Sequence, residues 1–163
     1  RRLLTYDEKS AGGIMTTEPV ILAHDATVAE ALARIRNEEL PTSLAAQVYV
    51  TRSPLETPTG HFLGVVHFQR LLREQPGTLV SSLVDNDLES VDPEAPLDEV
   101  VRHFARYNLV GLPVVDNNDH LLGVVTVDDV VDNMLPEDWR ESYPASSDTD
   151  LISSRQAGDG DGD

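Results

Sequence analysis

The sequence predicts an α+β fold built from two similar units, each consisting of a strand, a helix, two strands and a final helix. Two recurrences support this prediction. The helical pattern that follows Thr27 returns 69 residues later, and the apolar run Phe62–His67 returns 59 residues later as Leu121–Thr126. Recurrence along a chain is the signature of a repeated structural unit. Because a unit of roughly sixty residues is marginally stable alone, we expect the two units to pack sheet against sheet.

In the first unit, a capping box marks the start of a helix, because Glu30 follows the N-cap Thr27 by three residues. Apolar residues then recur at helical spacing, at Val28, Ala31, Leu32 and Ile35. Two apolar runs and a short amphipathic segment predict two strands and a helix, at Gln47–Thr51, Phe62–His67 and Phe68–Arg73. Residues 52–61 between the strands contain two prolines and a glycine, which are typical of a loop.

The second unit repeats these elements with a shorter loop. Its first helix is preceded by Pro96, and its apolar positions are Leu97, Val100, Val101 and Phe104. Two strands and a final helix are predicted at Leu112–Asp116, Leu121–Thr126 and Val127–Asn133. The hairpin between the two strands is closed by the polar residues Asp116–His120.

The composition is that of a soluble globular protein. Among the 163 residues, the longest apolar runs are far short of the ~20 residues that cross a bilayer, and the polar opening is unlike a signal peptide. The absence of cysteine excludes disulfides and zinc–thiolate sites in this sequence, and we expect a cytoplasmic location. Five histidines without metal-ligand spacing and no P-loop or nucleophile motif indicate that the chain is not an enzyme.

The net charge of −17 is unevenly distributed. Residues 1–80 carry nine acids and eight bases, residues 81–140 carry fourteen acids and three bases, and residues 141–163 carry six acids and one base. This acidity argues against nucleic acid as a partner and favours cations. The last segment is rich in Ser, Asp and Gly, so we expect an acidic, disordered C-terminal tail.

The second unit carries a family resemblance. Its segments Leu112–Asp116 and Leu121–Val130 resemble the second half of a cystathionine-β-synthase (CBS) domain, and the first unit is a more divergent copy. A tandem pair of such domains is a Bateman module. The stretch Tyr6–Thr16 is similar to the junction that precedes the CBS pair in the MgtE family of magnesium transporters.

This resemblance implies a domain organisation and a set of partners. We expect a linker, a first CBS domain, a second CBS domain and the tail, at residues 1–13, 14–76, 77–140 and 141–163. The family implies a preceding N-terminal helical domain, a homodimer formed through the CBS domains, Mg²⁺ bound between domains and control of a transmembrane channel. Because proline and acidic residues follow the pair where the family continues into membrane spans, a separate soluble MgtE-like regulator acting on a transporter is also expected.

CBS modules often bind adenosine nucleotides such as ATP, ADP or AMP through a Gly-x-x-Thr/Ser-x-x-Asp segment. Residues 123–129 match it, so Thr126 would face a phosphate and Asp129 would accept from the ribose hydroxyls, with Gly111 and Pro113 completing the predicted site. The first unit has His67 and Arg70 at the matching positions, so at most one nucleotide site is expected. Alternatively, Thr126 is an N-cap and the acids after it offset the helix dipole without any ligand.

Mg²⁺ prefers oxygen ligands, above all carboxylates. The family pattern points to Asp116 and Asp128, and Asp132 lies one helical turn after Asp128 on the same face. Asn117 and Asn118 stand where the family has further acids, so we expect weaker Mg²⁺ binding. The alternative is a solvated acidic face that binds no metal.

Two functional hypotheses follow. The first is a cytosolic regulatory module that senses Mg²⁺ or an adenine nucleotide and changes the relation between its units or between subunits of a dimer. A ligand achieves this only if it binds one arrangement better than the other. The second is a structural dimerisation module that binds no ligand.

Overall fold

The computed structural model describes residues 6–85, 89–107 and 109–135. The chain divides into two compact units, residues 1–131 and residues 132–163, and all five strands lie in the first. The acidic tail predicted for residues 141–163 lies outside the described residues. Within the described residues, no helix is long and apolar enough to cross a membrane.

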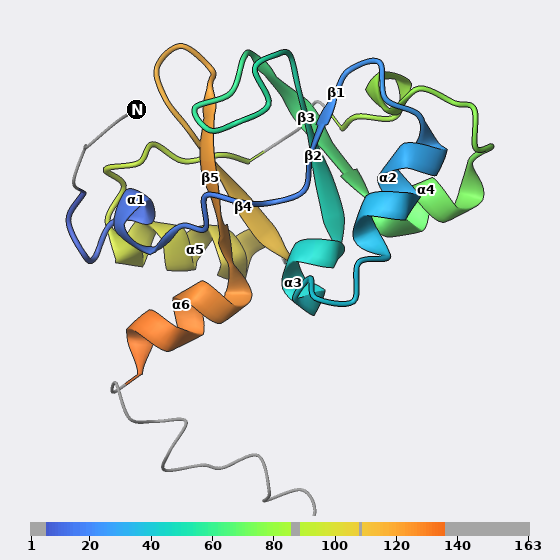
Figure 1. The fold of residues 1–163 in the computed structure, drawn as a ribbon. Coiled ribbons are helices and arrows are strands. Elements are labelled where there is room, and N and C mark those ends of the chain that lie inside the picture. Colours follow the sequence, from blue (N-terminus) through green and yellow to red (C-terminus); the bar gives the residue numbers. More distant parts are fainter. Residues whose placement is uncertain (1–5, 86–88, 108, 136–163) are drawn as a thin grey trace, which may run out of the picture. The chain divides into compact units, whose positions relative to one another are not determined.

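The first repeat forms a three-stranded sheet in which β2 is central (Figure 1). Strand β1 (Ile21–Ala23) runs parallel to β2 (Gln47–Thr51), and β3 (Phe62–His67) runs antiparallel to it. The remaining elements of this repeat are α2 (Val28–Ile35), α3 (Thr42–Ala45), α4 (Phe68–Arg73) and the 3₁₀ turn η1 (Val80–Ser82). Buried side chains of α2, α4 and one sheet face form a continuous core with Val28, Ala31, Val48, Val50, Val66 and Leu71 at its centre.

The second repeat pairs β4 (Gly111–Val115) with β5 (Leu121–Thr126) in an antiparallel ladder. Its helices are α5 (Leu97–Tyr107) and α6 (Val127–Met134). The first strand of this repeat is reduced to one parallel bridge, in which Val91 lies opposite Val114. Two backbone bonds hold it, from the Val91 amide to the Pro113 carbonyl at 3.0 Å and from the Val115 amide to the Val91 carbonyl at 2.9 Å.

The predicted order of elements is confirmed in the first repeat. In the second repeat the helix, the two hairpin strands and the final helix follow as predicted, and the bridge at Val91 stands in place of the first strand. The bounds of β2, β3, β5 and α4 are those expected, whereas β4 begins and ends one residue earlier and α6 ends one residue later than predicted. Thr27 caps α2 as expected, since its Oγ1 accepts a hydrogen bond from the Glu30 amide at 3.2 Å. The short elements α1 (Ala11–Ile14), α3 and η1 were not predicted.

The segment that leads into the first repeat packs on the second one. Helix α1 contributes Ala11 and Ile14 to the core formed with α5, β4 and β5 (Figure 1). The Ala11 amide donates to the Ala95 carbonyl at 2.8 Å, and the Thr16 amide and carbonyl both bond to the backbone of Val124, at 2.8 and 2.9 Å. The N-terminal segment is therefore part of the second repeat's packing.

The long loop of the first repeat also joins the two repeats. The Thr59 amide donates to the Leu121 carbonyl at 3.0 Å, and the Thr59 hydroxyl accepts from the Leu121 amide at 3.1 Å. The Phe62 amide donates to the Asp119 carbonyl at 2.7 Å. Behind this ladder, a third apolar cluster includes residues of both sheets: Ile21, Tyr49, Val65, Leu121 and Val124.

Candidate functional site

Thr126 and Asp129 form a reciprocal capping box where β5 ends and α6 begins. The Thr126 amide donates to Asp129 Oδ2 at 2.9 Å, and the Asp129 amide donates to Thr126 Oγ1 at 3.2 Å. Thr126 is 3% exposed. These two bonds are the ones that the helix-capping interpretation requires. The nucleotide role of the same pair stays a prediction.

Thr16 is a third member of this site, and the motif search missed it. Its hydroxyl lies 3.4 Å from Asp129 Oδ2, and its backbone is held by the two bonds to Val124. Thr16 lies 113 residues before Asp129. Since a contact over such a separation leaves no local pattern, only the three-dimensional structure brings Thr16 to the site.

Burial raises the pKa of the Asp129 carboxyl above its ordinary value, because desolvation disfavours the charged form. The hydrogen bonds from Thr126 and Thr16 oppose this shift, and the charge of Asp128 adds to it. Each further donor placed against this carboxylate would favour its ionised form. The site therefore suits a ligand that offers hydroxyl groups.

The raised pKa of Asp129 predicts a pH-dependent stability. Because the folded-state pKa lies above the unfolded value, the folded protein holds this proton more tightly, and wild-type stability is lost as pH rises from about 4 through the folded pKa. The side chain introduced by Asp129→Asn does not titrate. The free energy of unfolding of this variant should therefore increase relative to that of the wild type between pH 4 and pH 7. Urea unfolding at several pH values measures this difference, with Asp25→Asn, an exposed acid in the first repeat, as control. A difference that stays constant with pH would contradict the assignment.

Gly111 lies beside the capping box, and Pro113 lies further along the same ladder. Gly111 is the ladder partner of Thr126, and Pro113 is the partner of Val124. A Cβ atom at Gly111 would come within 2.6 Å of the Tyr49 hydroxyl, so a side chain there is sterically blocked. Thus Gly111, Thr126 and Asp129 are brought to the same end of the sheet.

Gln47 and Tyr49 fill the space next to Gly111, and sequence reasoning had placed them only on a strand. Gln47 Nε2 donates to the Tyr49 hydroxyl at 2.7 Å and lies 3.5 Å from the Gly111 carbonyl oxygen. Burial raises the pKa of Tyr49 above its ordinary value, so its hydroxyl stays protonated. The pair forms a buried polar wall between the two repeats.

The matching position of the first repeat has different hydrogen bonds. Within the described chain, the side chain of His67, the N-cap of α4, makes no capping bond. Arg70 Nε pairs instead with Oε1 of Glu74, the C-cap of the same helix, at 3.0 Å. The two repeats therefore differ in the chemistry of this junction as well as in sequence.

The three acids predicted to bind Mg²⁺ come from two different elements, the β4–β5 hairpin and helix α6. Asp116 Oδ1 accepts from the amides of Asn118 and His120, both at 2.9 Å, and so stabilises the hairpin turn. Asp128 and Asp132 lie on α6. Among the described residues, no group of three or more His, Asp or Glu side chains is arranged to hold a metal ion. The described residues of one chain thus do not assemble the predicted site, and the metal role of these acids stays a prediction.

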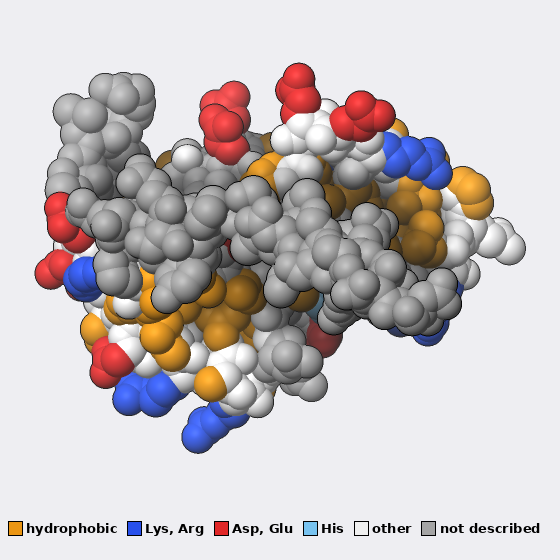
Figure 2. Space-filling view, turned by 90° about the horizontal axis from the view of Figure 1, so that it is seen from below, with side chains coloured by type: hydrophobic (Ala, Val, Ile, Leu, Met, Phe, Trp, Pro, Cys, Tyr) orange, Lys and Arg blue, Asp and Glu red, His pale blue; other side chains and the backbone are white. Residues whose placement is uncertain are grey.

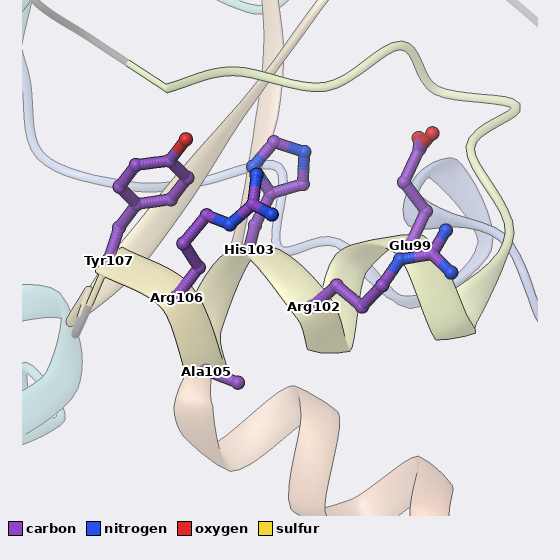
Figure 3. Close-up of a pocket in the computed structure, with 6 residues that line it drawn as sticks. All are labelled: Glu99, Arg102, His103, Ala105, Arg106 and Tyr107. Atoms are coloured by element: carbon purple, nitrogen blue, oxygen red, sulfur yellow. The ribbon is translucent and has the colours of Figure 1, made fainter.

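A group of basic side chains on α5 lines a separate hollow. Figure 3 shows Arg102, His103 and Arg106 on α5, with Glu99 and Tyr107 beside them. Neither Thr126 nor Asp129 contributes to this hollow.

The fold and the junction motif define the class of protein. The CBS domain family model matches residues 11–77 and 80–136. The chain therefore belongs to the CBS domain family and carries two copies of the domain. Within this family, it is similar to the CBS region of MgtE magnesium transporters.

Curated relatives and solved structures support this similarity. The magnesium transporter MgtE of Enterococcus faecalis is 32% identical over 132 residues, which cover 81% of this chain. MgtE of Thermus thermophilus is 34% identical over 130 residues, which cover 80% of this chain. The chain spans 28% of the length of either relative. The cytosolic domain of the Mg²⁺ channel MgtE, solved in complex with ATP, is 34% identical with a TM-score of 0.68, over 78% of this chain and 50% of that one. The soluble part of a magnesium transporter is 31% identical with the same TM-score, over 79% and 48%.

Proposed function

We propose that this CBS pair is the regulatory module of an MgtE-like magnesium transport system, on the cytosolic side of the membrane, and that its second repeat binds an adenine nucleotide. The main support for this proposal is the junction of β5 and α6, where Thr126 supplies a hydroxyl and Asp129 supplies a half-buried carboxylate. A relative's cytosolic domain was solved with ATP, which supports this choice of ligand. The start of α6 also favours a phosphate, because its amides and dipole attract anions.

In this proposal the nucleotide acts by replacing internal hydrogen bonds. Ribose hydroxyls that donate to Asp129 compete with the Thr16 hydroxyl, which now lies 3.4 Å from that carboxylate. Thr16 belongs to the N-terminal end of the first CBS domain, which packs on the second repeat. A ligand that favours one position of this segment would shift its equilibrium, which is the requirement for regulation.

Calorimetry with ATP, ADP and AMP on the purified chain tests the nucleotide site. Asp129→Ala and Thr126→Val should weaken binding by about tenfold or more, because each removes a hydrogen bond involving a charged group. His67→Ala and Arg70→Ala are matched controls at the corresponding junction of the first repeat and should bind as the wild type does. Equal affinity in all four variants, or no binding by the wild type, would refute the proposed site.

The same titrations, repeated with Mg²⁺, test the metal part of the proposal. We propose that Asp116, Asp128 and Asp132 contribute to Mg²⁺ sites that another domain or a second copy completes, since Mg²⁺ takes oxygen ligands from several sources. In a full-length relative, the domain that precedes the pair is the proposed source of the remaining oxygen ligands. Mg²⁺ would then draw the acidic surfaces together.

A ligand-free dimerisation module is the second candidate, and two observations favour it. The capping box accounts for Thr126 and Asp129 without a nucleotide. Large apolar side chains are also exposed on the helices, including Phe68 and Leu72 of α4 and Tyr107 of α5. Figure 2 shows exposed hydrophobic side chains in separate areas of the face in view, with charged side chains along its margin. Sedimentation of the samples used for calorimetry distinguishes the candidates, because a dimer unaffected by nucleotide or Mg²⁺ supports the second.

A further inference from the structure

Helix α5 carries an open hollow that the nucleotide and metal proposals leave unused. Its volume is about 490 Å³, and its lining residues are Glu99, Arg102, His103, Ala105, Arg106 and Tyr107. In Figure 3 the side chains of His103, Arg106 and Tyr107 rise from one side of the helix, Arg102 extends along the helix toward Glu99, and Ala105 points away from them. A hollow of this size accommodates a small molecule.

The hollow concentrates the positive charge of an acidic repeat. Within the described residues 89–135, Arg102 and Arg106 are the only Lys or Arg residues, and they lie one helical turn apart. Arg102 Nη1 is 3.8 Å from Asp98 Oδ2, but the two side chains are 70% and 74% exposed, so this ion pair contributes little. No ion-pair partner for Arg106 is found among the described residues.

One wall of the hollow is held in place by aromatic contacts. The Arg106 guanidinium carbon lies 6.0 Å from the centre of the Tyr107 ring, a cation–π distance. The His103 ring stacks on Tyr107 with centroids 6.1 Å apart, and its Nδ1 lies 3.3 Å from Glu89 Oε2 without an aligned hydrogen bond. A guanidinium held in this way loses less conformational entropy when it binds a ligand.

Compensation of the helix dipole explains only part of this arrangement. A basic residue in the last turn, such as Arg106, is common because it offsets the negative end of the helix. Arg102 lies in the middle of α5, where the dipole gives no reason for it. Two guanidiniums that open into one hollow offer a set of donors suited to planar or tetrahedral oxyanions.

We propose that the α5 hollow is an anion site, separate from the Thr126 and Asp129 junction, that binds a small oxyanion with two or more negative charges across Arg102 and Arg106. Phosphate and carboxylate oxygens share this chemistry. Glu99 lines the hollow with the guanidiniums, and Glu89 lies against His103, so both acids disfavour ligands whose charge extends beyond the two arginines. Binding should weaken steeply with salt, because the site is open to solvent.

Titration of the full chain with pyrophosphate and with citrate, in metal-free buffer at low salt, tests this site and separates the two sources of oxyanion. Arg102→Gln and Arg106→Gln should each weaken the preferred anion by about tenfold or more. Arg70→Gln is the matched control, an arginine on a short helix that pairs with Glu74. It should bind the anion as the wild type does, and urea unfolding should show that all three variants are folded.

Asp129→Ala and Thr126→Val separate this site from the nucleotide site. Both should leave pyrophosphate and citrate binding unchanged, and Arg106→Gln should leave the binding of uncharged adenosine unchanged. The proposal is overturned if neither anion binds at millimolar concentration, if Arg70→Gln weakens binding as much as Arg106→Gln, or if Asp129→Ala abolishes anion binding. A failure of nucleotide binding alone would leave the anion result intact.

Discussion

Replacing Tyr49 by alanine is expected to destabilise the protein by about 3–5 kcal/mol, the range for removing a large buried aromatic side chain. Tyr49 lies on β2, the central strand of the first sheet, and is 2% exposed. It packs in the apolar cluster that contains Leu121 and Val124 of the second repeat. Its loss would therefore open a cavity where the two repeats meet, and the polar Gln47 side chain would lose its partner at 2.7 Å.

Two further variants separate the causes. Tyr107→Ala removes the same side chain from an exposed position, 44% accessible, and should change the free energy of unfolding by no more than about 0.5 kcal/mol. Tyr49→Phe keeps the ring and removes only the hydroxyl that accepts from Gln47, so a cost of about 1 kcal/mol is expected. Urea unfolding measures all three. If Tyr49→Ala and Tyr107→Ala were equally mild, the buried junction would not be a source of stability.

The elements of the fold were predictable where their signals are local. Thr27 and Glu30 identify a helix start because a capping box needs only four consecutive residues. The strands β2, β3 and β5 were found because buried strands appear as short continuous apolar runs. The bounds shifted by one residue at β4 and α6, because the ends of elements are the least defined part of a local pattern.

The contacts that join the repeats could not be predicted, because they depend on residues far apart in sequence. Residues 52–61 were interpreted as a loop, and their prolines and glycine do form one. Nothing in that composition indicates that Thr59 and Phe62 would bond to the opposite hairpin. In the same way, the helical turn at Ala11–Ile14 is too short for a periodic pattern, yet it packs in the second core.

The candidate site was only partly predictable, because two chemical roles require the same residue spacing. A hydroxyl and a carboxylate three residues apart suit both a capping box and the CBS nucleotide motif, so Thr126 and Asp129 satisfy either interpretation from sequence. The structure supplies what spacing lacks, namely the position of Thr16 and the burial of Asp129. For Asp116 the outcome differs, because its carboxylate bonds to its own turn.

The structure also shows how charged residues are arranged within the acidic repeat. The sequence places eleven more acids than bases in residues 81–140, which suggested cations as partners throughout this region. The structure places Arg102 and Arg106 in the lining of the same hollow on α5. An acidic repeat can therefore present a local site for an anion, because the arrangement of charges and not their sum decides what binds at short range.

Gly60, in the loop that joins the repeats, should not tolerate a side chain. A Cβ atom at Gly60 would lie 2.3 Å from the Ser53 carbonyl oxygen and 2.5 Å from the Arg52 carbonyl oxygen. Because both obstacles are backbone, no rotation of a side chain can relieve the clash. Gly60→Ala must displace the loop, and with it the neighbouring Thr59 ladder, so a loss of about 3 kcal/mol is expected.

Gly77→Ala is the matched control for this prediction. No atom lies within 4 Å of a Cβ built at Gly77, and its backbone is not in the left-handed region. Alanine there should stabilise the protein by about 0.4–1 kcal/mol, since it restricts only the unfolded chain. Thermal and urea unfolding of both variants measure the contrast. If Gly60→Ala were as harmless as Gly77→Ala, the loop would be free to move without cost, and the ladder from Thr59 to Leu121 would not be what fixes one repeat against the other.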